Sequence, residues 1–206
     1  MTQRHLLIMI AALLAGSLAS FPARAWAYDR NAASQYADQY ALVPNSNWYT
    51  FTGDDCTNFI SQALQTGGET QVNQNYLPQN DNAWYMWQAP NWVWSNSWSV
   101  SGDNWQFMSN TGRAYQMYSV SGATYTTAHS GAYAGDLLYY AWYYRSNPPD
   151  ASIWHMAIQV QDNFDENNNW TSVVDSHSSF RYHANWTLFD FNRNPTTTQI
   201  YIVHVV

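Results

Sequence analysis

The sequence predicts an α+β fold in which helices from the N-terminal part of the chain cover one side of an antiparallel sheet. Two observations indicate this fold: helical periodicity is clearest before residue 70, and the last third of the chain is strand-like. Helices followed by a run of strands are typical of α+β proteins, whereas a parallel sheet needs strands and helices that alternate. The length after removal of a leader, roughly 180 residues, is that of one domain.

The first 27 residues have the features of a signal peptide. Arg4 and His5 precede an apolar run over residues 6–19, and small residues follow at two possible cleavage sites, Ala23-Arg24-Ala25 and Ala25-Trp26-Ala27. The run is short for a membrane span, and no cysteine near the cleavage sites could carry a lipid. We therefore expect a signal peptide over 1–27 and one secreted domain over 28–206, extracellular or in the cell envelope, without membrane association after cleavage.

Two helices are predicted before residue 70. Ala32, Tyr36 and Tyr40 recur every four residues, which predicts a helix that ends before Pro44. A second helix is predicted to begin within residues 53–58, where two aspartates are N-cap candidates, and to end at Gly67 and Gly68. This places Cys56 in the first turn of the second helix.

The remainder is predicted to be loops and then strands. Residues 70–131 lack strong periodicity and favour loops with one or two short helices, the best candidate covering about 103–118. Four later segments are rich in aromatic and β-branched residues and are predicted to be strands: 137–144, 153–161, 171–178 and 199–206.

The charge balance excludes some classes of partner. Removing Arg4 and Arg24 leaves five of the seven basic residues against fourteen acidic ones, a formal net charge of −9. Nucleic acids and anionic membranes are held by clustered basic side chains, so neither is expected as a partner. We expect a monomer with no cofactor and no metal.

Cys56 is the only cysteine, so an exported chain cannot use it in an internal disulfide. Backbone N–H groups at a helix start favour a thiolate, which is a nucleophile. Such a nucleophile needs an imidazole within hydrogen-bond reach and a third polar group to orient that imidazole. The alternative interpretation is a small buried thiol with a structural role.

The predicted strands supply candidates for both partners. His155 should share a strand face with Ile153 and Ala157, while Asp175 and His177 should share a face of the next strand. In a suitable register, His155 would face Asp175 or His177 across the pair. The same side chains could instead bind zinc together with Cys56, but their spacing is unlike compact zinc signatures.

Several short motifs occur in order along the chain. The most specific is Asp55-Cys56-Thr57-Asn58-Phe59-Ile60-Ser61-Gln62, and the others are Tyr28 to Ala33 with Tyr36-Ala37, Gly67-Gly68, Ser97-Trp98, Gly135-Asp136, His155 to Ile158 and Ser176-His177-Ser178. Together they resemble the bacterial putative amidase domain family, which is assigned to the NlpC/P60-like, papain-related hydrolases. The resemblance implies a papain-like core with Cys56 as nucleophile and His155 as general base. It favours His177 over Asp175 as the third residue.

The substrate expected from this resemblance and from export is a peptide or amide bond, in peptidoglycan or in another peptide. Trp98 and Trp84 are candidates for lining a substrate groove, since aromatic rings offer an apolar face and a polar edge. Trp154 should point away from His155 and serve packing. Two alternatives remain: a non-catalytic module that binds glycan or cell-wall polymer, and an acyltransferase on the same fold.

Overall fold

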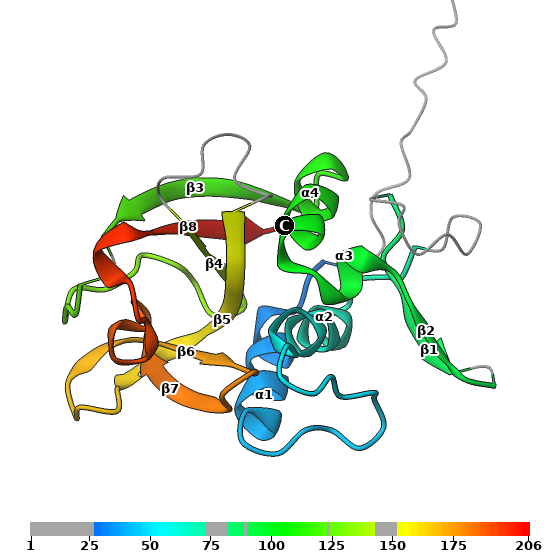
Figure 1. Ribbon diagram of the computed structural model, residues 1–206, viewed down its shortest axis with the longest axis horizontal. Helices are drawn as coiled ribbons and strands as arrows, with labels where there is room; N and C mark the ends of the chain where they lie inside the picture. Colours follow the sequence, from blue (N-terminus) through cyan, green and yellow to red (C-terminus); the bar gives the residue numbers. More distant parts are fainter. Residues whose placement is uncertain (1–26, 73–81, 89, 123, 143–151) are drawn as a thin grey trace, which may run out of the picture.

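The computed structural model describes residues 27–72, 82–88, 90–122, 124–142 and 152–206. Nearly all of the predicted signal peptide lies outside these ranges. Figure 1 shows strongly curved strands, with α1, α2 and α4 packed beside them. In the described part of the chain, no helix combines the length and apolar character needed to cross a membrane.

Helices α1 (Arg30–Tyr40) and α2 (Cys56–Thr66) confirm the two helices predicted before residue 70. The Asp29 carboxylate caps α1 by accepting the main-chain N–H of Ala32 at 3.0 Å. Gly67 ends α2 where α1 crosses closely, and a Cβ there would lie 2.5 Å from the ring of Tyr28. A side chain at position 67 would therefore push the two helices apart.

The principal sheet has six antiparallel strands in the order β3-β8-β4-β5-β6-β7. The four predicted strands correspond to β4, β5, β6 and β8, and the α+β class is confirmed; β3 and β7 were not predicted. The bounds are β3 Ala114–Ser121, β4 Leu137–Trp142, β5 Ile153–Phe164, β6 Trp170–Ser176, β7 Arg181–Asn185 and β8 Thr198–Val205.

The middle of the chain differs from its prediction. The helix expected over 103–118 is α4 (Ser101–Asn110), which ends before a turn at Gly112 with a φ of 66° and is followed by β3. A small hairpin of β1 (Met86–Gln88) and β2 (Trp92–Trp94) precedes the one-turn helix α3 (Asn96–Ser99). Two short 3₁₀ helices, Phe189–Phe191 and Pro195–Thr197, lie between β7 and β8.

Both faces of the sheet are buried in apolar clusters. The cluster on the helix side includes Phe59 of α2, Phe107 of α4 and Met156 of β5. The opposite cluster includes Tyr140 of β4 and Ala157 of β5. Because neighbouring residues of a strand point to opposite faces, β5 contributes to both clusters and runs through the centre of the protein. The relation of this fold to the papain-like NlpC/P60 core stays a prediction.

Candidate active site at the start of helix α2

Cys56 begins α2, and its thiol is buried against β5. Its Sγ atom lies 3.7 Å from Thr57 Oγ1, and the backbone of Met156 and the hydroxyl of Ser178 also form hydrogen bonds with it. Burial raises the pKa of the Cys56 thiol, and these hydrogen bonds oppose the increase only in part. The resting group is thus a neutral thiol, which corrects the expectation of a thiolate based on the helix start alone.

Asp55 and His177 hold the start of α2 in place. Asp55 accepts the main-chain N–H of Phe51 at 2.8 Å through Oδ1, and its Oδ2 lies 2.6 Å from His177 Nδ1. The other ring nitrogen of His177 lies 2.8 Å from the carbonyl oxygen of Tyr40, at the end of α1. Since both neighbours are acceptors, a doubly protonated imidazole satisfies both. The ring also stacks on Phe59, with centroids 3.9 Å apart.

Neither candidate for the third catalytic residue contacts His155 in this structure. The ring nitrogens of His177 meet Asp55 and Tyr40, as described. Asp175 accepts the main-chain N–H of His183 at 2.7 Å, and its register partner on β5 is Ile158. The register therefore places Asp175 too far along β5 to orient His155.

His155 is buried on β5, and its nearest polar partner is the unpredicted Arg181 of β7. The Nη1 atom of Arg181 lies 3.0 Å from His155 Nε2. Burial, together with the nearby guanidinium, lowers the pKa of His155 to about 3. The imidazole is consequently neutral at physiological pH, as a general base must be before it accepts a proton.

A bulge at Trp154 changes the direction of the side chains at the start of β5. Tyr140 pairs with His155, but the next residue of β4, Ala141, pairs with Ile153, so Trp154 is an extra residue in the ladder. The ring of Trp154 consequently stacks on His155, with centroids 5.6 Å apart and planes inclined by 24°. This corrects the expectation that Trp154 points away from His155.

Arg181 is the polar residue of the site that sequence reasoning missed. Its Nη1 donates to Ser176 Oγ at 3.2 Å, and the guanidinium lies over the ring of Phe191 at 4.8 Å. Arg181 Nε and Trp154 Nε1 are buried donors that lack a hydrogen-bond partner within the described residues. Two residues that contact His155 thus carry unused N–H groups. The scarcity of basic residues was the one signal in the sequence that could have drawn attention to Arg181.

Trp84 and Trp98 are fully buried and offer no surface to a substrate in this structure. Trp98 Nε1 donates to Asn58 Oδ1 at 2.8 Å, and Trp84 Nε1 donates to Ser61 Oγ at 3.1 Å. The two rings lie 4.7 Å apart and pack beneath α2. The sequence reasoning selected them as groove residues because their burial was not apparent from their polar neighbourhood.

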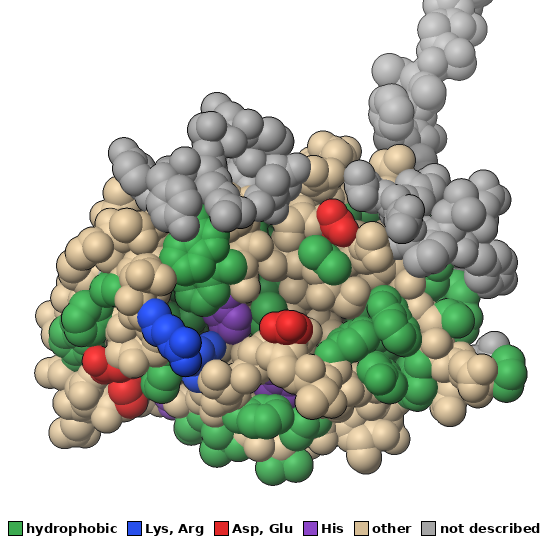
Figure 2. Space-filling view, in the orientation of Figure 1, with side chains coloured by type: hydrophobic (Ala, Val, Ile, Leu, Met, Phe, Trp, Pro, Cys, Tyr) green, Lys and Arg blue, Asp and Glu red, His purple; other side chains and the backbone are tan. Residues whose placement is uncertain are grey.

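A different group of aromatic rings reaches the surface beside α2. Tyr49 stacks on Trp94 with centroids 5.4 Å apart, and Phe51 meets the edge of Trp94 at 4.9 Å. Trp48 and Trp92 extend the group, with centroids 6.3 Å apart. None of the five is fully buried, and Figure 2 shows hydrophobic side chains gathered on the surface over β1 and β2. We call Trp48, Tyr49, Phe51, Trp92 and Trp94 the aromatic surface.

Comparison with known proteins gives two partial relatives. A stretch of 88 residues, 43% of this chain, is 38% identical to uncharacterized protein YhbB of Bacillus subtilis (strain 168) and covers 26% of that protein. A stretch of 40 residues, 19% of this chain, is 52% identical to uncharacterized protein YjcM of the same organism and covers 10% of it. The chain thus spans about a quarter or less of these curated relatives. No solved structure matches it.

The family comparison covers almost the whole described domain. Residues 27–203 match the family described as a putative amidase domain, a description that suggests hydrolysis of amide bonds. The matched range contains Cys56, His155 and Arg181, and both helices that position the thiol. The chain belongs to the putative amidase domain family.

Proposed function

We propose that this protein is an exported cysteine amidase that cleaves amide bonds in peptidoglycan peptides, with Cys56 as nucleophile and His155 as general base. The proposal rests on one contact: the Cys56 thiol forms a hydrogen bond with the backbone of Met156, the residue that follows His155 on β5. Amide hydrolysis is suggested by the family. The cysteine mechanism, the export and the substrate are our proposals.

The reaction begins from a neutral thiol and a neutral imidazole. In the resting site the lone pair of His155 Nε2 accepts from Arg181 Nη1, so the guanidinium must first release it. As Cys56 Sγ attacks the substrate carbonyl carbon, the thiol proton then passes to His155 Nε2, and an S–C bond forms while the carbonyl oxygen becomes an oxyanion. The positive charge of Arg181 favours the sulfur anion as it forms, since an opposite charge nearby stabilises the ionised group. His155 then protonates the leaving amine, and water hydrolyses the thioester.

The oxyanion needs donors that already point toward it. The first main-chain N–H groups of α2 have no acceptor within the helix, so the N–H of Cys56 is one candidate. The unused N–H groups of Trp154 and Arg181 are further candidates, because both side chains contact His155. A substrate carboxylate would be an equally suitable partner for Arg181.

The aromatic surface suits a substrate that contains sugar or peptide. Its rings are joined to the start of α2, because the carbonyl of Tyr49 accepts from Asn58 Nδ2 at 2.7 Å and Phe51 N–H donates to Asp55. A ligand lying on these rings would approach Cys56 along the loop before α2. Rings with an apolar face and a polar edge bind such ligands well.

The central experiment compares wild type with Cys56→Ala on purified peptidoglycan, with products identified by mass spectrometry. Wild type should release fragments with new amino and carboxyl ends, and Cys56→Ala should release none. His129→Ala is a matched control, because His129 is a surface histidine paired with Asp162. Equal product from wild type and Cys56→Ala would overturn the cysteine mechanism.

A second candidate function, a cell-wall binding module without catalysis, is favoured by the aromatic surface and by the raised pKa of the thiol. Sedimentation with insoluble peptidoglycan separates the two functions. A binding module would retain full binding in Cys56→Ala and show no turnover in wild type.

Added amines would be incorporated into products if the enzyme is an acyltransferase.

Export has its own test. The N-terminal residue of protein recovered from the medium or the envelope of an expressing bacterium should be Trp26 or Tyr28, following cleavage after Ala25 or Ala27. Protein that keeps Met1 and stays inside the cell would contradict the signal peptide.

A further inference from the structure

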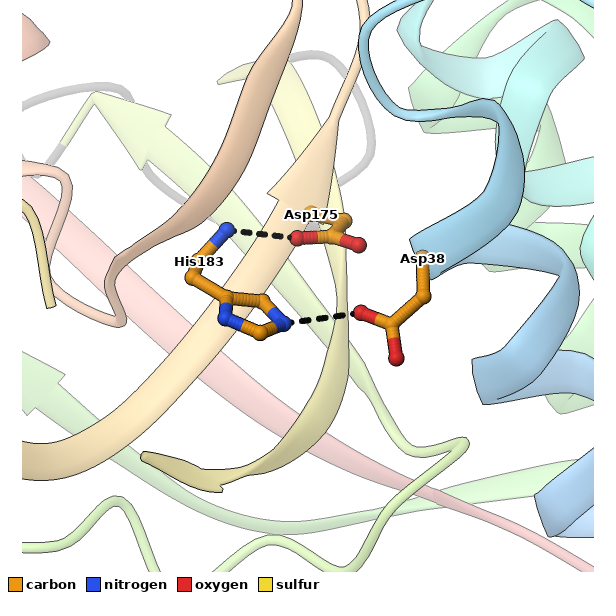
Figure 3. A group of neighbouring side chains, drawn as sticks. All are labelled: Asp38, Asp175 and His183. Atoms are coloured by element: carbon orange, nitrogen blue, oxygen red, sulfur yellow. Dashed lines mark hydrogen bonds and ion pairs between the residues drawn. The ribbon is translucent and has the colours of Figure 1, made fainter. Parts of the chain in front are cut away.

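Three ionisable side chains from three different elements meet on the helix side of β6 and β7. Asp38 comes from α1, Asp175 from β6 and His183 from β7, and a ligand atom from each lies within 4.8 Å of the other two. His183 Nε2 lies 2.8 Å from Asp38 Oδ1, and Figure 3 shows both carboxylates directed toward the histidine. Among the residues that the structure describes, this is the group with the spacing of metal ligands.

Asp175 shows that the cluster is incomplete. Its side chain is fully buried, Oδ1 accepts the His183 main-chain N–H, and Oδ2 has no hydrogen-bond partner in the described residues. In Figure 3 this second oxygen lies on the side of Asp175 that faces Asp38. A buried carboxylate oxygen facing another carboxylate requires a proton or a cation.

The backbone at His183 has an unusual conformation that serves this arrangement. Its φ of 52° lies in the left-handed region, which is uncommon for a residue within a strand. This conformation presents the main-chain N–H to Asp175 while the ring of the same residue reaches Asp38. The ring is further fixed by Tyr182, with centroids 3.8 Å apart. Strained residues of this kind persist where surrounding contacts require them.

We propose that Asp38, Asp175 and His183 form a binding site for one divalent transition-metal cation of the zinc class. The site is separate from Cys56 and His155, and it does not depend on the proposed hydrolase activity. Protein carboxylate oxygens and an imidazole nitrogen would supply three ligands, and water would supply the fourth.

The geometry allows the cation to be bound with small movements. Ligand atoms around a tetrahedral zinc at about 2.1 Å are about 3.4 Å apart. His183 Nε2 and Asp38 Oδ1, which lie 2.8 Å apart, would therefore separate slightly, while the other pairs, which lie within 4.8 Å, would close by at most about 1.4 Å. Asp38 can make this adjustment because a third of its side chain is exposed, at 34%, which also gives the cation a path from solvent. With a cation on Nε2, His183 Nδ1 would carry its proton, so the Asn163 amide, whose Nδ2 lies 3.3 Å away, would have to rotate to present its oxygen.

The donor set indicates the class of metal. An imidazole nitrogen with two carboxylate oxygens suits zinc and its first-row neighbours, whereas calcium and magnesium prefer oxygen ligands throughout. The bound cation would connect α1 to the β6–β7 hairpin. That hairpin carries Ser178 and Arg181, which contact Cys56 and His155, so the cation would stabilise the part of the sheet beside the active site.

The test is zinc binding to untagged protein in a Cys56→Ala background, which removes the thiol as a competing ligand. Titration against a chromophoric zinc chelator should give one zinc per chain, and zinc should raise the Tm while EDTA reverses the increase. Asp38→Asn should weaken zinc binding at least about tenfold, as expected for loss of one ligand. His183→Asn should do the same, and asparagine tolerates a positive φ.

The matched control is His129→Asn, since His129 and Asp162 form a histidine–carboxylate pair 3.0 Å apart at the surface. This variant should bind zinc as tightly as its parent. The proposal is overturned if no saturable binding occurs, if Asp38→Asn binds zinc as well as its parent, or if His129→Asn weakens binding equally. Displacement of zinc by an equal concentration of calcium would overturn the assigned class of metal.

Discussion

His155 Nε2 and Arg181 Nη1 lie 3.0 Å apart, and this contact determines which nitrogen of His155 carries the proton. A guanidinium only donates, so Nε2 must accept and the proton of the neutral ring lies on Nδ1. The burial that lowers the pKa of His155 also raises that of Cys56. The resting site therefore holds two neutral groups. Substrate binding must contribute part of the free energy for proton transfer from the thiol to the imidazole.

Removing the charge of Arg181 should raise the pKa of His155. In Arg181→Met the opposing positive charge is lost while burial remains, so the pKa should rise above about 3 and stay below the ordinary 6.5. NMR titration of the histidine Cε1 protons measures this directly. Arg193→Met is the matched control, because Arg193 is exposed between the two 3₁₀ helices. An unchanged His155 titration in Arg181→Met would contradict the role of the guanidinium.

Acid should destabilise the protein partly through His155. Below pH 6.5 the unfolded chain protonates this histidine, while the folded protein resists until about pH 3. The contribution of His155 is complete above pH 6.5 and is lost as the pH falls, with a slope of about 1.4 kcal/mol per pH unit. Urea unfolding of wild type and His155→Gln between pH 6.5 and 4 should show a shallower decline in the variant. Parallel curves would show that His155 titrates normally.

The Cys56 thiol should react slowly with iodoacetamide in the folded protein. Because burial raises its pKa, the labelling rate should increase only above the ordinary thiol pKa of about 8.5. The same chain in urea provides the reference for an exposed thiol. Rapid labelling at neutral pH in the folded protein would indicate that a thiolate forms before substrate binds.

The pair of Asp55 and His177 should contribute to stability as a unit. Both side chains are almost entirely buried, and removing one partner of such a pair typically costs about 3 kcal/mol or more. His177→Ala and Asp55→Asn should each lower the free energy of unfolding, and the double variant should cost much less than the sum. Additive losses would show that the two residues act independently.

Two tryptophan substitutions should separate packing from substrate binding. Trp98→Phe leaves buried Asn58 Oδ1 without its donor and should cost about 1–3 kcal/mol of stability, with KM unchanged. Trp94→Ala should instead raise KM with little effect on stability, since Trp94 belongs to the aromatic surface. Thermal unfolding and peptidoglycan hydrolysis measure the two effects. If Trp98→Phe instead raises KM and Trp94→Ala lowers stability, Trp98 would be the residue that lines the substrate groove.

The two helices before residue 70 and four strands of the principal sheet were predictable because their signals are local. Asp29 and Gly67 mark helix ends by side-chain capping and by the absence of a Cβ, and both effects act within a few residues. The strand β7 escaped prediction because His183 occupies a left-handed conformation and the half-buried Arg181 makes a polar contact with His155. Such features depend on partners far along the chain.

The sequence was a better guide to which residues lie near the site than to the contacts between their side chains. Cys56 lies against the backbone of Met156, the residue after His155 on β5, and the catalytic roles of Cys56 and His155 stay predictions. Counting every second residue placed Ile153, His155 and Ala157 on one face, but the bulge at Trp154 puts Ile153 with the helix-side core and Ala157 with the opposite core. One extra residue was enough to change which side chains meet.

The position of β8 has a consequence for how the chain folds. The last strand lies between β3 and β4, and Arg30, at the start of α1, donates to the carbonyl of Val205 at its end. During synthesis, neither β3 nor β4 can gain its shared neighbour until residues 198–205 have been made and have left the ribosome. Contacts so distant in sequence make folding slow.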